Sequence, residues 1–297
     1  MKKIIVATKF EFYPDQQERL AKLGDVKFYD GQSATTDEWL ERCKGADIIC
    51  TNTFGFKERV YELKDVFIVF PFVGVGFLDK EKLKTRNITV ANCPGGNKYA
   101  VSEWIIGMMI NLFRKLPSFI NIKDINSYAI SYKAGVGLFG KKICILGKGN
   151  IGNQVGKVCE ALGIQVSYYL RGDDLSTKIK EVDCIVNCLS HNPDTENLLD
   201  KKFFSSLKPN SYYITISSPK IHDKTALFEA LDKGILAGAA FDVGNVDDPN
   251  YQELINHPKI MSTPHVAAKT DVTARISYDM MIDNVEAWIK GKLINLI

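Results

Sequence analysis

The sequence predicts an α/β protein of two domains, each a parallel β-sheet flanked by helices, and three observations carry this prediction. The chain has 297 residues, which fits two domains of roughly 100–200 residues each. Short apolar runs alternate with segments of helical spacing in two series, which is typical of βαβ units. A glycine-rich turn stands near the start of the second series. The composition, 45% hydrophobic and 25% charged, is that of an ordinary globular protein.

The first series runs to about residue 92, and a long helix follows it. The expected strands of this series cover residues 3–8, 47–51, 66–70 and 88–92. Helical spacing lies between them over residues 15–23 and 36–44. The largely apolar segment 99–115 predicts a long helix, with Asn97 as its expected N-cap.

The second series begins at residue 141. Its expected strands cover residues 141–147, 165–170, 183–189, 211–217, 238–243 and 259–264. The last segment, residues 271–290, has a broad apolar face and therefore predicts a helix. That face is formed by Ile276, Met280, Ile282, Val285 and Ile289.

Charge and hydropathy exclude two classes of partner. Lys and Arg number 38 against 35 Asp and Glu, a net charge of +3, so no large basic field favours nucleic acid. The longest apolar stretch, residues 66–77, is shorter than the about 20 residues of a membrane span. Residues 1–10 lack the cleavage site of a signal peptide and predict a buried strand. We therefore expect no nucleic-acid partner, no membrane partner and a cytoplasmic location.

Seven cysteines occur, and none forms a C-x-x-C pair. Their odd number and their spacing argue against a disulfide framework or a zinc site. Cys144 and Cys184 lie inside apolar runs, so we expect the cysteines to be small buried hydrophobes in a reducing compartment. No metal is expected.

The glycine-rich turn has the pattern G-x-G-x-x-G at Gly147, Gly149 and Gly152. It follows a predicted strand and precedes a helix-like run, and this context favours a dinucleotide site over an ordinary glycine turn. The first glycine allows a tight turn, the second lets a pyrophosphate approach the backbone, and the third lets helix pack on strand. The N–H groups at the start of the helix attract phosphates.

The end of the next strand bears on the choice of cofactor. A fold that selects NAD carries an acid there for the ribose 2′-hydroxyl, whereas this strand ends with Leu170 and Arg171. Because a guanidinium pairs with a 2′-phosphate, we expect NADP in preference to NAD. The alternative is that Arg171 is a solvated residue and Asp173 or Asp174 binds the ribose.

Six segments, taken in order, carry a resemblance to a known family. They are VGVG (73–76), NCPGGN (92–97) followed by VSE (101–103), GKGNIG (147–152), LKPNSYYITISS (207–218), FDV (241–243) and STPHVAAKT (262–270). Their order and spacing resemble those of the D-isomer-specific 2-hydroxyacid dehydrogenases, which include glycerate dehydrogenase, glyoxylate/hydroxypyruvate reductase and phosphoglycerate dehydrogenase. The resemblance covers nearly the whole chain.

The resemblance implies two Rossmann-like domains. A dinucleotide-binding domain over residues 98–270 would be inserted into a discontinuous outer substrate domain, residues 1–97 and 271–297. The helix over residues 99–115 is apolar on more than one face. Packing inside one chain would explain this, but members of the family commonly dimerise through this region, so we expect a homodimer.

Members of this family use a His, an acid and an Arg. His265 matches the family's proton donor in TPHVAAKT, and a histidine suits proton exchange near neutral pH. Asp247 falls at the position of the acid, one methylene shorter. Ser218 stands where the family has its substrate-binding Arg, and a serine cannot hold a carboxylate bidentately. Lys220 is the nearest cation. The alternatives are that His265 has only a structural role, that Asp247 lies in a solvated acidic loop, and that Lys220 is a solvated loop residue.

The resemblance also implies the ligand contacts of other residues. Asp242 would accept a hydrogen bond from the nicotinamide carboxamide. Val75 and Gly76 would offer backbone N–H groups to the substrate, in a loop two residues shorter than the family pattern. The expected cofactor contacts are completed by Gly147, Gly149, Asn150, Ile151, Gly152, Arg171 and Leu189. The remaining histidines, expected on the surface, are His191, His222 and His257.

These residues predict an oxidoreductase that transfers a hydride between NAD(P) and a small 2-oxoacid, 2-hydroxyacid or related carbonyl compound. The alternative is a catalytically impaired cofactor-binding sensor or regulator, which the Ser218 position and the shortened loop favour. A reductase whose substrate lacks a carboxylate is a third reading.

Overall fold

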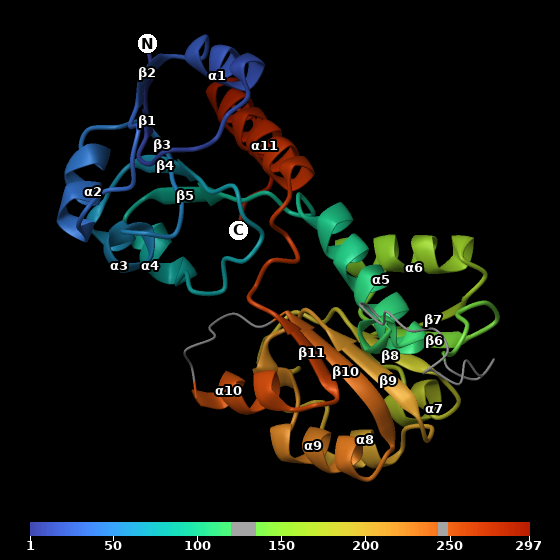
Figure 1. Ribbon diagram of the computed structural model, residues 1–297. Helices are drawn as coiled ribbons and strands as arrows, with labels where there is room; N and C mark the ends of the chain where they lie inside the picture. The colour runs from blue at the N-terminus through green and yellow to red at the C-terminus, as the bar shows by residue number, and fades with distance from the viewer. Residues whose placement is uncertain (120–134, 243–248) are drawn as a thin grey trace. The chain divides into compact units, whose positions relative to one another are not determined.

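The computed structural model describes residues 1–119, 135–242 and 249–297. The chain forms two compact units (Figure 1). The first joins Met1–Asn97 to Lys269–Ile297, and the second is Lys98–Ala268. Each unit holds one parallel sheet covered by helices, which confirms the predicted fold class.

The sheet of the first unit has the strand order β2-β1-β3-β4-β5, with every pair parallel. Its strands are β1 (Lys3–Val6), β2 (Asp25–Phe28), β3 (Ile48–Cys50), β4 (Val66–Val69) and β5 (Ile88–Ala91). Strand β2 was not among the predicted strands. It lies at the sheet edge and alternates exposed with half-buried residues, so it lacks the apolar run that reveals a central strand.

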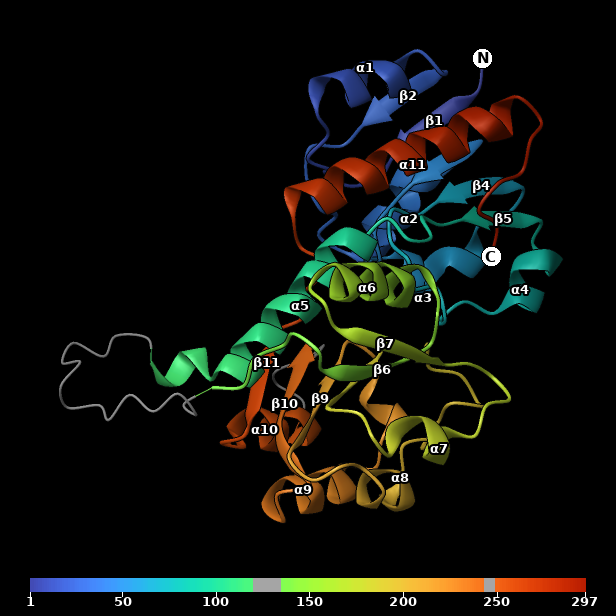
Figure 2. The same ribbon diagram turned by 90° about the vertical axis from the view of Figure 1, so that its right-hand side faces the viewer.

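Helices from both ends of the chain cover this sheet. The short elements are α1 (Pro14–Ala21), α2 (Thr36–Cys43), α3 (Phe56–Arg59), η1 (Val60–Glu62) and α4 (Lys80–Thr85). Helix α11 (Asp271–Ile289) lies beside α1 in both ribbon views (Figure 2). It buries Met281, Ile282 and Val285, and Trp288 stacks on Phe67 of β4 with the ring centroids 5.3 Å apart.

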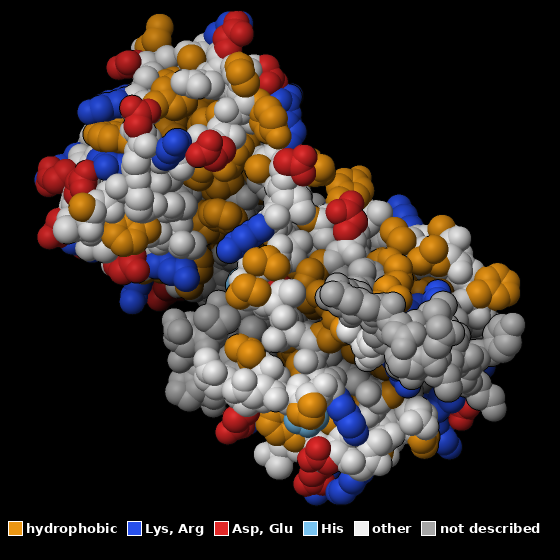
Figure 3. All heavy atoms as spheres, in the orientation of Figure 1, with side chains coloured by type: hydrophobic (Ala, Val, Ile, Leu, Met, Phe, Trp, Pro, Cys, Tyr) orange, Lys and Arg blue, Asp and Glu red, His pale blue; other side chains and the backbone are white. Residues whose placement is uncertain are grey.

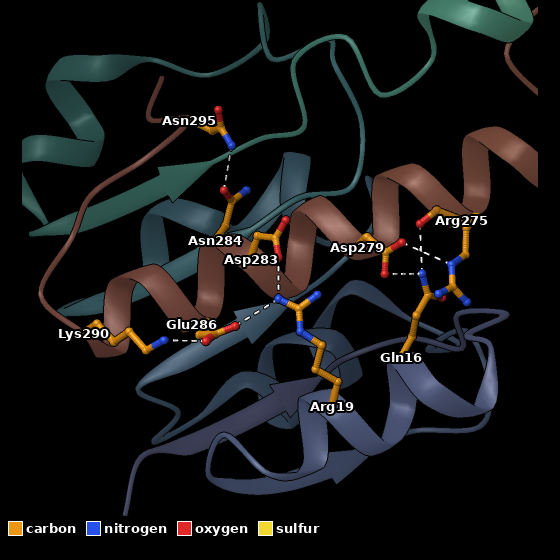
Figure 4. A network of polar contacts seen from close by, with 9 residues as sticks. All are labelled: Gln16, Arg19, Arg275, Asp279, Asp283, Asn284, Glu286, Lys290 and Asn295. Carbon is orange, nitrogen blue, oxygen red and sulfur yellow. Dashed lines mark hydrogen bonds and ion pairs between the residues drawn. The ribbon is translucent and has the colours of Figure 1, made fainter.

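A polar network fastens α1 to α11 (Figure 4). Arg19 forms ion pairs with Asp283 and, at 2.9 Å, with Glu286. The amide nitrogen of Gln16 donates to Asp279 Oδ1 at 2.9 Å. Near the C-terminus, Asn295 donates to Asn284 Oδ1 at 2.8 Å. These contacts fix how the two sequence segments of the first unit pack against each other.

The sheet of the second unit has the order β11-β10-β9-β8-β6-β7 and is also parallel throughout. Its strands are β6 (Lys142–Leu146), β7 (Gln165–Tyr169), β8 (Cys184–Asn187), β9 (Ser211–Thr215), β10 (Leu236–Asp242) and β11 (Ile260–Thr263). Two apolar cores lie on its two faces. The order reverses at β6, and ligands of such sheets bind at the carboxyl edge beside the reversal.

The helices divide between these faces. Helices α5 (Lys98–Arg114) and α6 (Asn150–Ala161) pack on one face, and the other face is covered by α7 (Leu175–Ile179), α8 (Lys201–Ser205), α9 (Lys224–Asp232) and α10 (Pro249–Asn256). Two short 3₁₀ turns, η2 (Leu116–Ser118) and η3 (Pro219–Ile221), complete the unit. The predicted N-cap of α5 is wrong, because Asn97 Oδ1 is buried and accepts no hydrogen bond.

Four surface and core properties bear on function. In the described parts of the chain, no helix combines the length and hydropathy of a membrane span, and no cluster of His, Cys, Asp and Glu is arranged to hold a metal. On the face shown in Figure 3, basic and acidic side chains are interspersed over both units. Six cysteines are buried and Cys188 is partly buried. Burial raises the pKa of the Cys188 thiol to about 12.

Candidate active site

The glycine turn joins β6 to α6 and leaves space at the start of that helix. Gly147 adopts a φ of 93°, and its N–H donates to Tyr169 O at 3.0 Å. A Cβ on Gly152 would overlap the carbonyl oxygen of Gly147, whereas a Cβ on Gly149 would meet no atom within 4 Å. Gly152 is therefore required by the fold, and Gly149 keeps the helix N-terminus open to a ligand.

A cavity of about 330 Å³ opens at this end of α6. It is lined by Lys98, Lys148, Gly149, Asn150, Asn153, Gln154 and Lys157. Its three lysines come from α5, the turn and α6, and in the described parts of the chain none forms an ion pair with a carboxylate. Unpaired cations beside the positive end of a helix dipole suit the phosphates of a dinucleotide.

The residues after β7 include a cation and two acids that bind local backbone groups. Arg171 is exposed and forms an ion pair with Asp194. Asp173 accepts the N–H of Leu170 at 2.9 Å, and Asp174 caps α7 by accepting the N–H of Ser176 at 3.0 Å. Both acids accept hydrogen bonds from local backbone N–H groups, and the exposed Arg171 is the cation next to the end of this strand.

His265 lies in a tight turn after β11. Its φ is 54°, a left-handed conformation that is uncommon for a residue other than glycine. Its N–H donates to Thr263 O at 3.0 Å. The imidazole is exposed and has no hydrogen bond to any described residue, so it is available to a ligand. The predicted acid Asp247 lies outside the described residues.

Asp242 holds this turn in place. Its Oδ1 accepts the Thr263 hydroxyl at 2.6 Å and the N–H of Val266 at 2.8 Å, and its Oδ2 accepts the N–H of Ala267 at 2.9 Å. The Thr263 oxygen in turn accepts the indole N–H of Trp104, from α5, at 3.0 Å. The carboxylate thus fixes the two residues that follow His265. Sequence reasoning did not assign Trp104 or Thr263 to this site, because their contact joins residues far apart in the chain.

Ser218 and Lys220 flank the turn η3 after β9. The Ser218 hydroxyl caps this turn by accepting the N–H of Lys220 at 3.3 Å. The Lys220 side chain is exposed and has no carboxylate partner among the described residues. Ser218 therefore has a local structural role, while the lysine charge is uncompensated.

The predicted surface location of His222 is wrong. Its side chain is only 4% exposed, and its ring lies edge-on to Tyr213 and Phe241. Neither ring nitrogen has a hydrogen-bond partner, and burial lowers its pKa to about 4. His257 is also less exposed than predicted, since it stacks on Phe228, whereas His191 is exposed as expected. The prediction for His222 was wrong because the residue occupies an apolar core position, and its residue type does not indicate such a position.

Val75 and Gly76 lie in the loop after β4 in the first unit. Their N–H groups have no partner among the described residues, and Asn92 braces the loop by donating to Val73 O at 2.8 Å. Phe77 packs against the buried Phe56 and Phe70. The loop therefore presents free backbone donors next to an aromatic cluster.

The predicted cofactor contacts Asn150, Ile151 and Leu189 all lie in the second unit. Asn150 and Ile151 begin α6. Leu189 follows β8, and its side chain lies 3.4 Å from the position of a Cβ on Gly147. These residues adjoin the glycine turn.

Comparison with known proteins identifies the family. Residues 106–267 match the family model of the D-isomer specific 2-hydroxyacid dehydrogenase NAD binding domain. The chain is 26% identical over 310 residues to D-3-phosphoglycerate dehydrogenase of Methanocaldococcus jannaschii, covering 99% of this chain and 58% of that protein. It is 28% identical over 279 residues to glycerate dehydrogenase of Methylorubrum extorquens, covering 89% of both.

Solved structures share the fold over the full length. An acyclic imino acid reductase in complex with NADPH and D-Arg has a TM-score of 0.84 at 22% identity, covering 99% of both chains. A glyoxylate reductase from Paecilomyes thermophila has a TM-score of 0.81 at 21% identity, covering 100% of this chain and 98% of that one. The family match spans more than half of the 297 residues, and this chain belongs to the D-isomer specific 2-hydroxyacid dehydrogenase family.

Proposed function

We propose that this protein is an NAD(P)-dependent oxidoreductase acting on a small 2-oxoacid, 2-hydroxyacid or related carbonyl compound. The observation that carries the proposal lies in the second unit, whose larger part matches a nicotinamide-cofactor domain. There, Asp242 clamps the turn of an exposed His265, and an open glycine turn starts α6. When bound, the cofactor supplies hydride chemistry, and the protein supplies orientation and charge.

The residues of the second unit fit a dinucleotide. Gly149 leaves room for phosphates at the start of α6, where Asn150 and Ile151 offer backbone N–H groups, and the lysines of the cavity add positive charge. Asp242 uses three acceptor positions on the protein's own groups. A carboxylate has about four, so one position is free for the nicotinamide carboxamide.

His265 is the proposed proton donor to the carbonyl oxygen during reduction, with Asp247 as the acid that supports its charged form. Lys220 is the proposed anchor of a substrate carboxylate in place of the family's Arg, since its ammonium has no other carboxylate partner in the described chain. In the first unit, Val75 and Gly76 offer their free N–H groups to the substrate.

We further propose NADP as the preferred cofactor and a homodimer as the working assembly. Leu170 replaces the acid that would repel a 2′-phosphate, and Arg171 is exposed next to it. Helix α5 supports dimerisation, because Trp104, Met108 and Ile110 are half-exposed on it. Sedimentation giving a single species of 33.3 kDa at micromolar concentration would contradict the dimer.

The activity test is the oxidation of NADPH and NADH with glyoxylate, hydroxypyruvate and a neutral carbonyl compound. We expect turnover with NADPH in preference to NADH, a preference that Arg171→Ala removes. His265→Ala should lower kcat by about 10²–10⁴, while His257→Ala at the end of α10 should not. Lys220→Ala should raise KM for the acids only. Tight NADPH binding without turnover of any substrate would contradict the proposed enzymatic activity and favour a cofactor-binding sensor.

A further inference from the structure

A chain of hydrogen bonds connects helix α5 to the histidine turn, and its direction is fixed by chemistry. An indole N–H only donates and a carboxylate only accepts. The Thr263 hydroxyl lies between the two, 3.0 Å from Trp104 Nε1 and 2.6 Å from Asp242 Oδ1. It must therefore accept from Trp104 and donate to Asp242, so the two partners together fix the orientation of the hydroxyl.

The far end of this chain holds His265 in a conformation that it would not adopt freely. The left-handed backbone at φ 54° is strained for a residue with a Cβ. It persists because both sides of the residue are tied. The N–H of His265 binds Thr263 O at 3.0 Å, and the next two N–H groups bind Asp242 at 2.8 and 2.9 Å. The direction of the imidazole thus depends on how well Asp242 is held.

We propose that Trp104 is a positioning residue for His265, acting through Thr263 and Asp242. Trp104 is half-buried on α5, a rigid element packed against the sheet, and its N–H stabilises the one arrangement of Thr263 in which Asp242 receives the hydroxyl proton. The proposal rests on the proposed role of His265 in proton transfer. A catalytic group displaced by about 1 Å can lose about 100-fold in rate.

The primary test is Trp104→Phe, which keeps an aromatic ring and removes the N–H. We expect kcat to fall about 10- to 100-fold, while the substrate KM changes less than about twofold. The substrate KM should hold because Lys220, the proposed carboxylate anchor, does not depend on this hydrogen bond.

The chain offers a matched control in the first unit. Trp39 donates its indole N–H to Thr51 Oγ1 at 2.8 Å and is fully buried. Trp39→Phe therefore removes the same type of hydrogen bond in the other unit. Both variants should lower Tm by about 2–4 °C, but only Trp104→Phe should lower kcat. Equal effects of the two variants on kcat would show a purely structural role and overturn the proposal.

Variants of Thr263 test the middle of the chain. Thr263→Val has nearly the same shape and lacks the hydroxyl, so it should lose kcat as Trp104→Phe does. Thr263→Ser keeps the hydroxyl and should retain kcat within about threefold. The double variant Trp104→Phe/Thr263→Val should be no worse than Thr263→Val alone, because the two residues act in series. Full activity of Thr263→Val would contradict the proposal.

Amide hydrogen exchange separates this inference from the proposed function. In the cofactor-free protein, the amides of Val266 and Ala267 should exchange about tenfold faster in Trp104→Phe than in wild type, and unchanged in Trp39→Phe. If wild type turns over no substrate, the proposed activity fails, and the exchange rates alone decide the positioning role. Unchanged exchange at Val266 and Ala267 in Trp104→Phe would overturn it.

Discussion

His222 is a core residue with unsatisfied polar atoms. Its ring packs against the rings of Tyr213 and Phe241, and no described group accepts or donates a hydrogen bond at either nitrogen. Burial keeps the imidazole neutral and lowers its pKa to about 4. In the unfolded chain its pKa is about 6.5, so unfolding takes up a proton at any pH between these values.

The sign of the resulting pH dependence follows from this uptake. Since the unfolded state binds more protons, the free energy of unfolding falls as pH drops from about 6.5 towards 4, by up to about 3 kcal/mol. His222→Leu should remove this part of the slope and leave stability at pH 7 equal or higher. Urea unfolding at pH 7, 6, 5 and 4.5 measures it. An unchanged slope in the variant would show that other groups cause the acid destabilisation.

At the scale of elements, two glycines of the strand–turn–helix unit of β6 and α6, Gly149 and Gly152, have different roles. The carbonyl oxygen of Gly147 occupies the position where Gly152 would carry a Cβ, whereas the space next to Gly149 is open. Gly152 is needed for folding, because helix and strand must approach closely. Gly149 is needed for binding, because the space next to it serves only a ligand.

Two alanine variants separate these tasks. Gly152→Ala should lose at least about 2 kcal/mol of stability, because its Cβ would displace backbone. Gly149→Ala should unfold like wild type but bind NADPH at least about tenfold more weakly, because its methyl group occupies the phosphate space. Thermal unfolding and fluorescence titration with NADPH measure the two effects. A Gly149→Ala protein with wild-type affinity would place the phosphates elsewhere.

At the scale of the whole molecule, the chain leaves the first unit at Asn97 and returns to it at Lys269. The returning helix α11 contributes apolar residues to the core of that unit, including the fully buried Ile282. It also brings the carboxylates that pair with Arg19 on α1. The first unit is therefore complete only when both ends of the chain are folded together.

Apolar packing should contribute more than the ion pairs to the stability of the contact between α11 and the rest of the first unit. Ile282→Ala removes buried methyl groups and should lower the free energy of unfolding by about 2–5 kcal/mol. Arg19→Gln breaks ion pairs that are partly exposed and should lower it by about 1 kcal/mol or less. Chemical unfolding followed by tryptophan fluorescence compares them, since Trp288 stacks on Phe67 in this core. A larger loss in Arg19→Gln would reverse this order.

The sequence by itself determined the fold class, most strands, the long helices α5 and α11, the glycine turn and the family. These features depend on local information. Apolar periodicity identifies strands and helices, and the three glycines of the turn are required by nearby backbone. Local information failed at β2, an edge strand without an apolar run, and at the cap of α5, where a suitable residue type makes no bond.

Only the tertiary structure decided which partners the polar side chains have. Asp242, Thr263 and Trp104 come from β10, β11 and α5, and the three lysines of the cavity come from α5, the glycine turn and α6. His222 has the sequence context of a loop residue, but the fold packs it against two aromatic rings. The physical reason is that a hydrogen bond or a buried position is created when distant elements pack together, and no spacing along the chain encodes that contact.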